Sequence, residues 1–384
     1  MSALNPFDFL TAGRIRFGRG QAETAVEEII RRGHRVLLVR GRSVAWADEL
    51  SANLEDKGVT LESVFCTAEP DLAMLEAARK TTQQAQSDVV VAVGGGAVID
   101  LAKAIAALAP SNSAALDHLE GVGQGQPLTA DPLPFIALPS TAGTGAEVTK
   151  NAVISVPDAG RKVSLRDDRM LPNLAIIDPA LTDNAPRSVT LSSGLDAVTQ
   201  VIEPYLCNRS NPLVDAIARA AIPVGLSALA QLEQGESAAA RDQMAYVSLV
   251  GGMALANAGL GAVHGLAGVV GGRLGAPHGL ICGRLLGPVL AANHEALLQQ
   301  GQSVERFDEV AHWLSTHLDI GTDNPFEALS ALLDQWQVDR LGKWLADDVN
   351  LHTLAEEAAG ASSMRANPCV LSTDALVGIM RAAA

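Results

Sequence analysis

Aromatic and cationic side chains are scarce in this chain of 384 residues. Phe, Trp and Tyr together make up 3% of the sequence, so the chain lacks the stacking platforms with which many proteins bind single-stranded nucleic acids. The 28 Lys and Arg residues are outnumbered by 43 Asp and Glu residues, which leaves a net charge of −15. This excess of negative charge disfavours nucleic acids and anionic membranes, and we expect neither as a partner.

Cysteine is also rare, and its spacing excludes two kinds of site. The four cysteines lie far apart, with no C-x-x-C pair among Cys66, Cys207, Cys282 and Cys369. This spacing argues against a disulfide framework and against a structural zinc knuckle. The N-terminal sequence lacks the basic and apolar regions of a secretory signal, so we expect the chain to be cytoplasmic.

Residues 249–272 contain no charged side chain when histidine is counted as neutral. A segment of this length raises the question of a membrane span, but it carries eight glycines together with Asn257 and His264. Its hydrophobic content is therefore low for a helix that crosses a bilayer. We expect a buried helix of a helical bundle here and no membrane partner.

Apolar residues are plentiful, at 48% of the sequence, and they form two successive patterns. In the first half, short apolar runs that are typical of buried strands alternate with segments of helical periodicity. The expected strands are 14–18, 35–39, 59–66, 88–93, 135–138 and 174–177, and the expected helices are 23–32, 44–57, 72–84 and 98–108. This alternation predicts an α/β domain with a parallel sheet covered by helices.

From about residue 188 onward, long Ala- and Leu-rich helical patterns are separated by Gly, Pro and Asn. We therefore predict an α/β domain over residues 1–185 and an all-α helical domain over residues 186–384. Ligand sites often lie between domains, so we expect the active site there.

Two loops that follow expected strands have the composition of a nucleotide-binding site. The first is Gly94–Gly96, where glycines allow close backbone approach and the next helix presents free N–H groups to a phosphate. The second loop carries the hydroxyls of Ser140, Thr141, Thr144 and Thr149. Taken singly, these are a tight β–α turn and a helix cap, but two such loops after parallel strands favour a dinucleotide. The G-x-G-x-x-G and GK[ST] motifs are absent, so neither an ordinary Rossmann nor a P-loop assignment is supported.

Arg40 and Arg42 follow another expected strand. A carboxylate at this place would suit the ribose hydroxyls of NAD, whereas arginines suit the additional phosphate of NADP. The alternative is a solvated pair of surface arginines. The sequence favours NADP over NAD.

A candidate metal site combines residues that are distant in the sequence. Asp196 and Gln200 are four residues apart and project from one face of an expected helix, which Pro204 should bend or end. With His264 and His278 they offer a carboxylate, an amide oxygen and two imidazoles to a divalent metal. The alternative for each histidine is a hydrogen-bonded residue of the core.

These motifs, in this order and over nearly the full length, resemble the iron-containing (group III) alcohol dehydrogenases of the dehydroquinate synthase-like superfamily. The resemblance rests on seven segments: Arg14–Gly20, Gly94–Lys103, Pro139–Thr149, Asp178–Pro179, Gly194–Ala197, Gly261–His278 and Asn367–Pro368. It implies an N-terminal dinucleotide-binding α/β domain, a C-terminal helical domain that holds the metal, and a homodimer or higher homo-oligomer.

The resemblance also implies roles for individual residues. The metal positions of the family correspond to Asp196, Gln200, His264 and His278, of which Asp196, His264 and His278 are the expected catalytic residues. The implied cofactor contacts, together with the two arginines, are Gly95, Gly96, Ala97, Asp100, Ser140, Thr141, Thr144, Thr149, Lys162, Arg40 and Arg42. Asn151 corresponds to a position near the nicotinamide, and Gly41 stands where relatives that use NAD often carry an acidic residue.

Two departures from the family pattern concern the metal and the proton path. Gln200 stands where iron-dependent members usually have histidine, and an amide oxygen is a poorer donor for Fe²⁺ than imidazole. Gly268 stands where many members have a second histidine with a role in proton transfer. The expected metal is therefore iron or zinc, held by at least Asp196, His264 and His278.

The expected function is NAD(P)-linked, metal-dependent hydride transfer between the nicotinamide and a small alcohol or aldehyde. Three alternatives remain at this point: a maleylacetate-type reductase with reduced or no metal dependence, a sugar-phosphate cyclase, and a non-catalytic nucleotide-binding homologue. The Thr-Ala-Gly-Thr-Gly sequence of the second loop favours a dehydrogenase over the cyclase.

Overall fold

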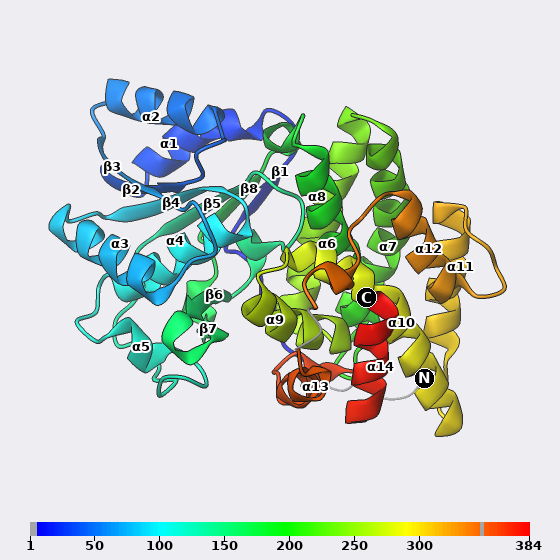
Figure 1. Cartoon of the computed structure of the whole chain (residues 1–384). Coiled ribbons are helices and arrows are strands. Elements are labelled where there is room, and N and C mark those ends of the chain that lie inside the picture. The colour runs from blue at the N-terminus through cyan, green and yellow to red at the C-terminus, as the bar shows by residue number, and fades with distance from the viewer. Residues whose placement is uncertain (1–5, 346–348) are drawn as a thin grey trace. The chain divides into compact units, whose positions relative to one another are not determined.

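The computed structural model describes residues 6–345 and 349–384, which form two compact units (Figure 1). The α/β unit comprises Ala12–Thr190 and Glu236–Ala245. The helical unit comprises the residues up to Thr11 together with Leu191–Gly235 and Tyr246–Ala384.

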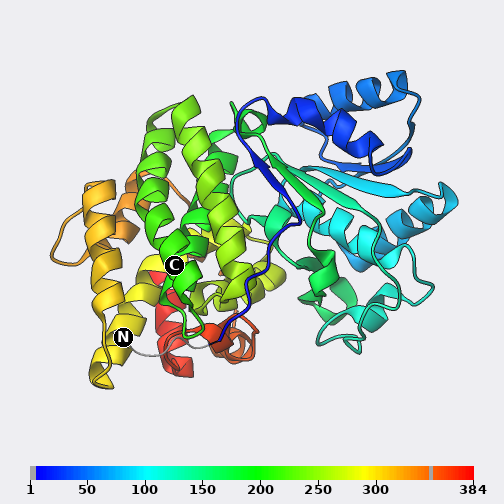
Figure 2. The ribbon, with the colours of Figure 1, turned by 180° about the vertical axis from the view of Figure 1, so that it is seen from behind.

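The α/β unit is built on a six-stranded parallel sheet with the strand order β1-β8-β5-β4-β2-β3. Its strands are β1 (Ile15–Phe17), β2 (Arg35–Arg40), β3 (Thr60–Phe65), β4 (Val89–Gly94), β5 (Phe135–Pro139) and β8 (Leu174–Ile177). Every residue of β4 and β5 is buried, which explains their continuous apolar sequences. Figure 2, seen from behind, shows β1 in dark blue at one edge of this sheet.

Helices cover both faces of the sheet. The helices of this unit are α1 (Ala25–Ile30), α2 (Trp46–Asp56), α3 (Leu72–Gln84), α4 (Gly96–Leu108) and α5 (Ala115–His118). On one face, α1 and α2 pack on alternate strand residues such as Leu38 and Val91. On the other face, α3 and α4 pack on the residues between them, such as Leu37 and Val90. Side chains of successive strand residues point to opposite faces, so a fully apolar strand supplies both cores.

A two-stranded antiparallel hairpin is the part of this unit that the sequence analysis did not predict. It consists of β6 (Asn151–Val156) and β7 (Arg161–Arg166), and β6 packs against α4. The turn between the strands ends at Gly160, whose φ of 60° is readily adopted by glycine.

The helical unit contains long helices joined by short connections. They are α6 (Arg187–Leu206), α7 (Pro212–Gln234), α8 (Ala238–Asn257), α9 (Ala262–Leu274), α10 (His278–Gln299), α11 (Glu305–Leu318), α12 (Pro325–Gln335), α13 (Leu351–Ala359) and α14 (Thr373–Ala383). The first residues of α6, up to Thr190, and of α8, up to Ala245, belong to the α/β unit. Helices α9, α12 and α14 all contact α10. The predicted fold class, an α/β part with a parallel sheet followed by a helical part, is confirmed.

One local expectation was wrong. The uncharged segment is two helices, because α8 ends at Asn257 and α9 begins at Ala262, with a bend of 99° between them. Gly259, at φ 137°, occupies the break in a conformation that other residues rarely adopt. Helix α6 ends at Leu206, two residues after Pro204, close to the place where the proline was expected to bend or end it.

One described helix, α7, is long and apolar enough to cross a bilayer by length and composition alone. Helices α8 and α9 are long and apolar enough only when they are counted together as one bent segment. Helix α7 buries one stripe of small and aliphatic residues, including Val214, Ala218 and Ile222, within the helical unit. This is the burial of a core helix.

Candidate active site

The predicted nucleotide loops lie together at the carboxyl edge of the parallel sheet. Strand β2 is followed in sequence by β3 on one side, whereas β4 is followed by β5 on the other, so the direction of strand succession reverses between β2 and β4. In open α/β sheets, ligands bind outside the carboxyl ends of the strands at such a reversal. Gly94 and Ser140 meet there, where the Ser140 N–H donates to the Gly94 carbonyl at 2.9 Å.

Gly95 and Gly96 lie so close to the second loop that a side chain at either position would require the neighbouring threonine to move. A Cβ atom on Gly95 would lie 3.1 Å from the Thr141 Oγ1, and one on Gly96 would lie 2.7 Å from the Thr144 Oγ1. Helix α4 starts here, and its N-cap residue is Gly95, which has no side chain to bond the first N–H groups. The backbone N–H groups of its first turn are therefore oriented to bind an anion, with two threonines beside them.

Lys103, which the sequence analysis did not single out, ties α4 to the second loop. Its Nζ donates to the Ala146 carbonyl at 2.7 Å, to the Thr149 Oγ1 at 2.8 Å and to the Asn151 carbonyl at 2.8 Å. The side chain is 1% exposed, so these three bonds hold a buried ammonium. Thr149 and Asn151 thus help to position the loop.

Two buried carboxyl groups surround this lysine. Asp100 accepts a hydrogen bond from the Val153 N–H at 3.0 Å, which ties α4 to the hairpin. Burial raises the pKa of Asp100 to about 6 and that of Glu147 to about 7, and it lowers the pKa of Lys103 to about 8. Attraction between Lys103 and each carboxylate opposes these changes.

The two candidate NADP arginines differ in their surroundings. Arg40 is buried at the end of β2, and its guanidinium binds the Asp48 carboxylate at 2.6 Å and the Val44 carbonyl at 3.3 Å. Arg42 lies over the ring of Phe65, with 5.3 Å between its Cζ and the ring centroid. Arg40 therefore supports the loop, and Arg42 is the better candidate for a phosphate.

The remaining two predicted cofactor residues, Ala97 and Lys162, lie in different elements of the α/β unit. Ala97 belongs to the first turn of α4, beside the glycines. Lys162 lies in β7 of the hairpin, and its ammonium forms an ion pair with Glu69 at 3.4 Å. These assignments stay predictions.

In the helical unit, three predicted metal ligands come together from three helices. The Asp196 Oδ1, from α6, lies 3.4 Å from the His264 Nε2, from α9, and 3.8 Å from the His278 Nε2, at the start of α10. A fourth residue, Cys282, joins them, and one potential ligand atom from each of the four lies within 4.8 Å of the others. The sequence analysis missed Cys282, although its place one helical turn after His278 was a signal.

Glu203 fixes the orientation and the proton of His264. Its carboxylate accepts a hydrogen bond from the His264 Nδ1 at 2.6 Å and another from the Val263 N–H at 2.7 Å. Nδ1 therefore carries a proton, and in the neutral imidazole it is Nε2, on the side of Asp196, that is free to bind a metal. A carboxylate that holds a histidine in this tautomer is the usual outer partner of a metal-binding imidazole.

Two buried polar atoms at the centre of the group have no hydrogen-bond partner among the described residues: the Asp196 Oδ1 and the His264 Nε2. Such atoms are costly unless a ligand or metal satisfies them. Burial would raise the pKa of Asp196, but His264 and His278 hold it below its ordinary value. The electrostatic interaction with Cys282, to which its side chain is also hydrogen-bonded, raises the pKa of His278 to about 9. A divalent cation fits this set of donors and would satisfy both atoms.

Two glycines of α10 allow it to approach α6 closely. A Cβ atom on Gly279 would lie 2.0 Å from the Ser192 carbonyl oxygen, and one on Gly283 would lie 2.7 Å from a methyl carbon of Leu195. Helix α10 is therefore pressed against α6 where His278 faces Asp196.

Comparison with known proteins identifies the family. The profile described as "Iron-containing alcohol dehydrogenase" matches residues 12–179, and the profile for the C-terminal part of the same family matches residues 190–384. The chain belongs to the iron-containing alcohol dehydrogenase family. The resemblance stated from the sequence is thus confirmed, and the chain is an oxidoreductase of the alcohol dehydrogenase type.

Relatives of this family match over most of the chain. "Probable alcohol dehydrogenase EutG" of Escherichia coli (strain K12) is 34% identical over 337 residues, which cover 87% of this chain and 82% of that protein. "NAD-dependent methanol dehydrogenase" of Bacillus methanolicus is 32% identical, with 72% of this chain and 70% of that protein covered. The solved structure of 1,3-propanediol oxidoreductase has a TM-score of 0.87 and 27% identity, and covers 99% of this chain and 100% of that chain.

The two departures from the family pattern have distinct surroundings. Gln200 is buried one turn after Asp196 in α6, and a Cβ atom on Gly251 of α8 would lie 3.5 Å from its amide nitrogen. Its role as a ligand stays a prediction. At Gly268 in α9, a Cβ atom would meet no described atom within 4 Å, so a side chain is accommodated at this position.

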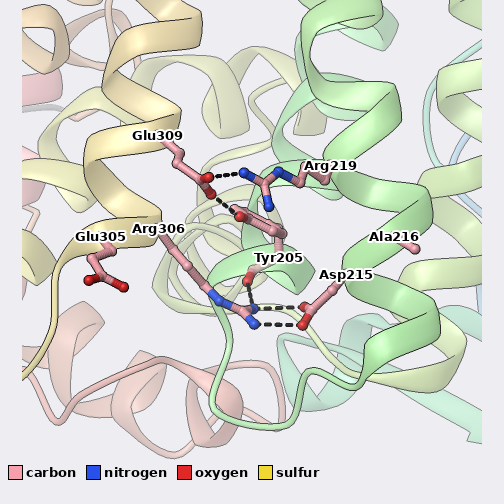
Figure 3. Close-up of a pocket in the computed structure, with 7 residues that line it drawn as sticks. All are labelled: Tyr205, Asp215, Ala216, Arg219, Glu305, Arg306 and Glu309. Atoms are coloured by element: carbon pink, nitrogen blue, oxygen red, sulfur yellow. Dashed lines mark hydrogen bonds and ion pairs between the residues drawn. The ribbon is translucent and has the colours of Figure 1, made fainter. Parts of the chain in front are cut away.

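A pocket in the helical unit, with a volume of about 410 Å³, is lined mainly by charged residues (Figure 3). Arg306 pairs with both carboxylate oxygens of Asp215, while Glu309 binds Arg219 and the Tyr205 hydroxyl. These charges neutralise one another across α7 and α11. The pocket therefore has the character of a structural ion-pair network.

Proposed function

We propose that the chain catalyses reversible hydride transfer between NADP(H) and a small alcohol or aldehyde, with a divalent metal held by Asp196, His264 and His278. The observation that carries this proposal is the group of these side chains, with the unpartnered Asp196 Oδ1 and His264 Nε2 at its centre. The carboxyl edge of the sheet in the α/β unit supplies the complementary nucleotide site.

The dinucleotide would bind through backbone and hydroxyl groups. Gly95 and Gly96 allow the pyrophosphate to approach the first turn of α4, where N–H groups and the helix dipole favour negative charge. Thr141 and Thr144 stand beside these glycines and offer hydroxyls to the same ligand. Lys103 keeps the second loop in place from behind.

The proposed preference for NADP(H) rests on the residues that follow β2, which include an arginine and no carboxylate. Gly41 contributes no carboxylate that would repel a ribose phosphate, and Arg42 follows it. Because Arg40 is bound to Asp48, we assign the phosphate contact to Arg42. Because the Bacillus methanolicus relative is named as an NAD-dependent enzyme, the test compares NADPH with NADH.

When bound, the metal would act as a Lewis acid that polarises the substrate carbonyl and stabilises the alkoxide. Asp196 contributes negative charge to the site, and the Nε2 atoms of His264 and His278 contribute neutral donors. Glu203 keeps the proton of His264 on Nδ1 throughout, which preserves Nε2 as a donor. Gln200 is proposed as a weak ligand or as a hydrogen-bond partner of water at the site.

We further propose a domain boundary, an oligomeric state and a location for the chain. The gap between the two family profiles, residues 180–189, supports a domain boundary near residue 185. A homodimer or higher homo-oligomer and a cytoplasmic location rest on the family resemblance and on the character of the N-terminal sequence.

A screen of NADPH and NADH oxidation over a panel of small aldehydes, with Fe²⁺, Zn²⁺ or a chelator, tests the function. We expect turnover that depends on metal and is faster with NADPH, and a loss of about 10³-fold or more in Asp196→Ala, since metal polarisation is worth several kcal/mol. Full activity with no bound metal would instead support the metal-independent, maleylacetate-type reductase. Nucleotide binding without turnover of any aldehyde would support a non-catalytic homologue.

A further inference from the structure

Cys282 occupies the position of a metal ligand. It lies in α10 one turn after His278, is fully buried, and its Sγ is 3.6 Å from the His278 Nε2. Residues four apart project from the same face of a helix, so the thiol and the imidazole are directed at the same point. That point is also faced by the unpartnered oxygen of Asp196 and the unpartnered nitrogen of His264.

Three of the six distances within this group are close to those of a tetrahedral site, and the other three are below 4.8 Å. With metal–nitrogen and metal–oxygen bonds of about 2.0–2.1 Å and a metal–sulfur bond of about 2.3 Å, neighbouring ligand atoms lie about 3.4 Å apart, or about 3.5 Å where one is sulfur. The His264–Asp196 distance is 3.4 Å, the His278–Cys282 distance is 3.6 Å, and the His278–Asp196 distance is 3.8 Å. A cation among them therefore requires little movement of the side chains.

We propose that Cys282 is the fourth protein ligand of the metal, in the place that the sequence analysis gave to Gln200. This inference rests on the proposed metal site of the preceding subsection. Binding replaces the S–H bond of Cys282 by a metal–sulfur bond and releases the proton to solvent, with no change of oxidation state. The donor set is then one carboxylate oxygen, two imidazole nitrogens and one thiolate sulfur.

This donor set favours zinc over ferrous iron. Thiolate is a soft ligand, and sites that combine thiolate with imidazole are typical of zinc. Zinc sites also expand to five ligands, so four protein ligands leave room for a substrate oxygen. The chain would in this way compensate for the absence of a histidine at position 200 by using a residue of α10.

Spectroscopy of the metal-loaded protein tests the assignment directly. In the Co²⁺-substituted protein we expect a near-ultraviolet sulfur-to-cobalt charge-transfer band, and in the Zn²⁺ protein an X-ray absorption spectrum with one sulfur at about 2.3 Å. Cys282→Ser should remove both signals and lower zinc affinity by more than the roughly 10–100-fold that follows loss of an outer partner. Gln200→Ala should retain both signals.

Cys66→Ser is the matched control, because Cys66 is a buried cysteine of the α/β unit whose thiol donates to the Ala68 carbonyl at 3.1 Å. A serine hydroxyl can make the same bond, so both signals should persist. Cys282→Ala, compared with wild type by circular dichroism and thermal unfolding of the metal-free proteins, separates ligand loss from misfolding.

The outcomes distinguish the two proposals. If the metal binds with oxygen and nitrogen neighbours only, or if the band survives in folded Cys282→Ser, the cysteine assignment is wrong while the proposed function stands. If the wild-type protein binds neither Co²⁺ nor Zn²⁺, the metal site itself is wrong, and the cysteine assignment falls with it.

Discussion

Glu147 illustrates how a single buried group couples the nucleotide loop to pH. It is 2% exposed, and its carboxyl lies close enough to Lys103 for the two charges to attract. Burial nevertheless dominates and raises the pKa of Glu147 from 4.5 to about 7 in the folded protein. The folded state therefore holds this proton more tightly than the unfolded state.

From this difference we predict the sign of a pH effect on stability. A carboxyl whose pKa is raised on folding stabilises the protein below about pH 4.5, and this contribution is lost as the pH rises to about 7. Glu147→Gln removes the titrating group, so its stability relative to wild type should improve by an amount on the order of 1–3 kcal/mol between these pH values, since one pKa unit corresponds to about 1.4 kcal/mol. Urea unfolding between pH 5.5 and 8 measures the difference and avoids the isoelectric region.

Asp100 titrates in the same pH range, but it is present in wild type and in Glu147→Gln. Its contribution therefore largely cancels in the stability difference between the two proteins. Glu23→Gln, at an exposed position in the short 3₁₀ helix Gln21–Thr24, serves as a control for the loss of one carboxylate. A stability difference that is constant over this pH range, or that shrinks as the pH rises, would show that Glu147 has an ordinary pKa.

Some residues of the candidate sites could be predicted from the sequence and others could not, because only some of them lie in recognisable motifs. Asp196, His264 and His278 were identifiable because the motifs around them resemble a known family. Cys282 and Glu203 were not, because their significance depends on distances between helices that are far apart in sequence. Lys103 was overlooked for a similar reason, since its three acceptors lie more than forty residues away.

At the scale of elements, packing of α10 on α6 determines the geometry of the candidate metal site. Alanine is normally favoured over glycine in a helix by roughly 0.5–1 kcal/mol. Gly279→Ala should do the opposite, because the new methyl group would lie 2.0 Å from the Ser192 carbonyl oxygen and 3.0 Å from the Asp196 Cβ. We expect a loss of about 1–3 kcal/mol in the free energy of unfolding. Zinc titration should show weaker binding as well, since His278 precedes this glycine.

Gly378→Ala in α14 provides the comparison, because a Cβ atom there would meet no described atom within 4 Å. This variant should match or exceed wild type in stability and bind zinc equally well. If instead both variants behave alike in urea unfolding and zinc titration, the close approach of α10 and α6 is absent.

The elements that the sequence analysis missed share a physical explanation. The β6–β7 hairpin is short and alternates buried with partly exposed residues, a weaker signal than the continuous apolar runs of the parallel strands. The break between α8 and α9 lies in a uniformly apolar, glycine-rich segment where periodicity gives no boundary. What fixes the start of α9 is the Glu203 carboxylate, which accepts from the N–H of Val263, and this contact is tertiary.

At the scale of the whole molecule, the order of patterns along the chain was enough to predict the fold class. Strand–helix alternation in the first part and long helices in the second leave few arrangements that bury the apolar faces. The compact units do not follow the chain strictly, however, because Glu236–Ala245 clusters with the α/β unit. These ten residues lie in a helical part of the sequence, and their hydrophobic periodicity is that of any other helical segment. Only the three-dimensional contacts show that they belong to the α/β unit.

The assignment of the two candidate sites to different units leads to a last prediction. A ligand that binds only the folded protein stabilises it by about 2.7 kcal/mol at one hundred times its dissociation constant, which corresponds to a rise of about 5–10 °C in melting temperature for a unit of this size. Asp196→Ala removes a proposed metal ligand, and Gly96→Ala places a methyl group 2.7 Å from the Thr144 hydroxyl in the proposed nucleotide site. We expect NADPH to stabilise Asp196→Ala as it does wild type, and Zn²⁺ to stabilise Gly96→Ala likewise. Differential scanning calorimetry measures both effects, and loss of both stabilisations in either variant would mean that the two ligands share one site.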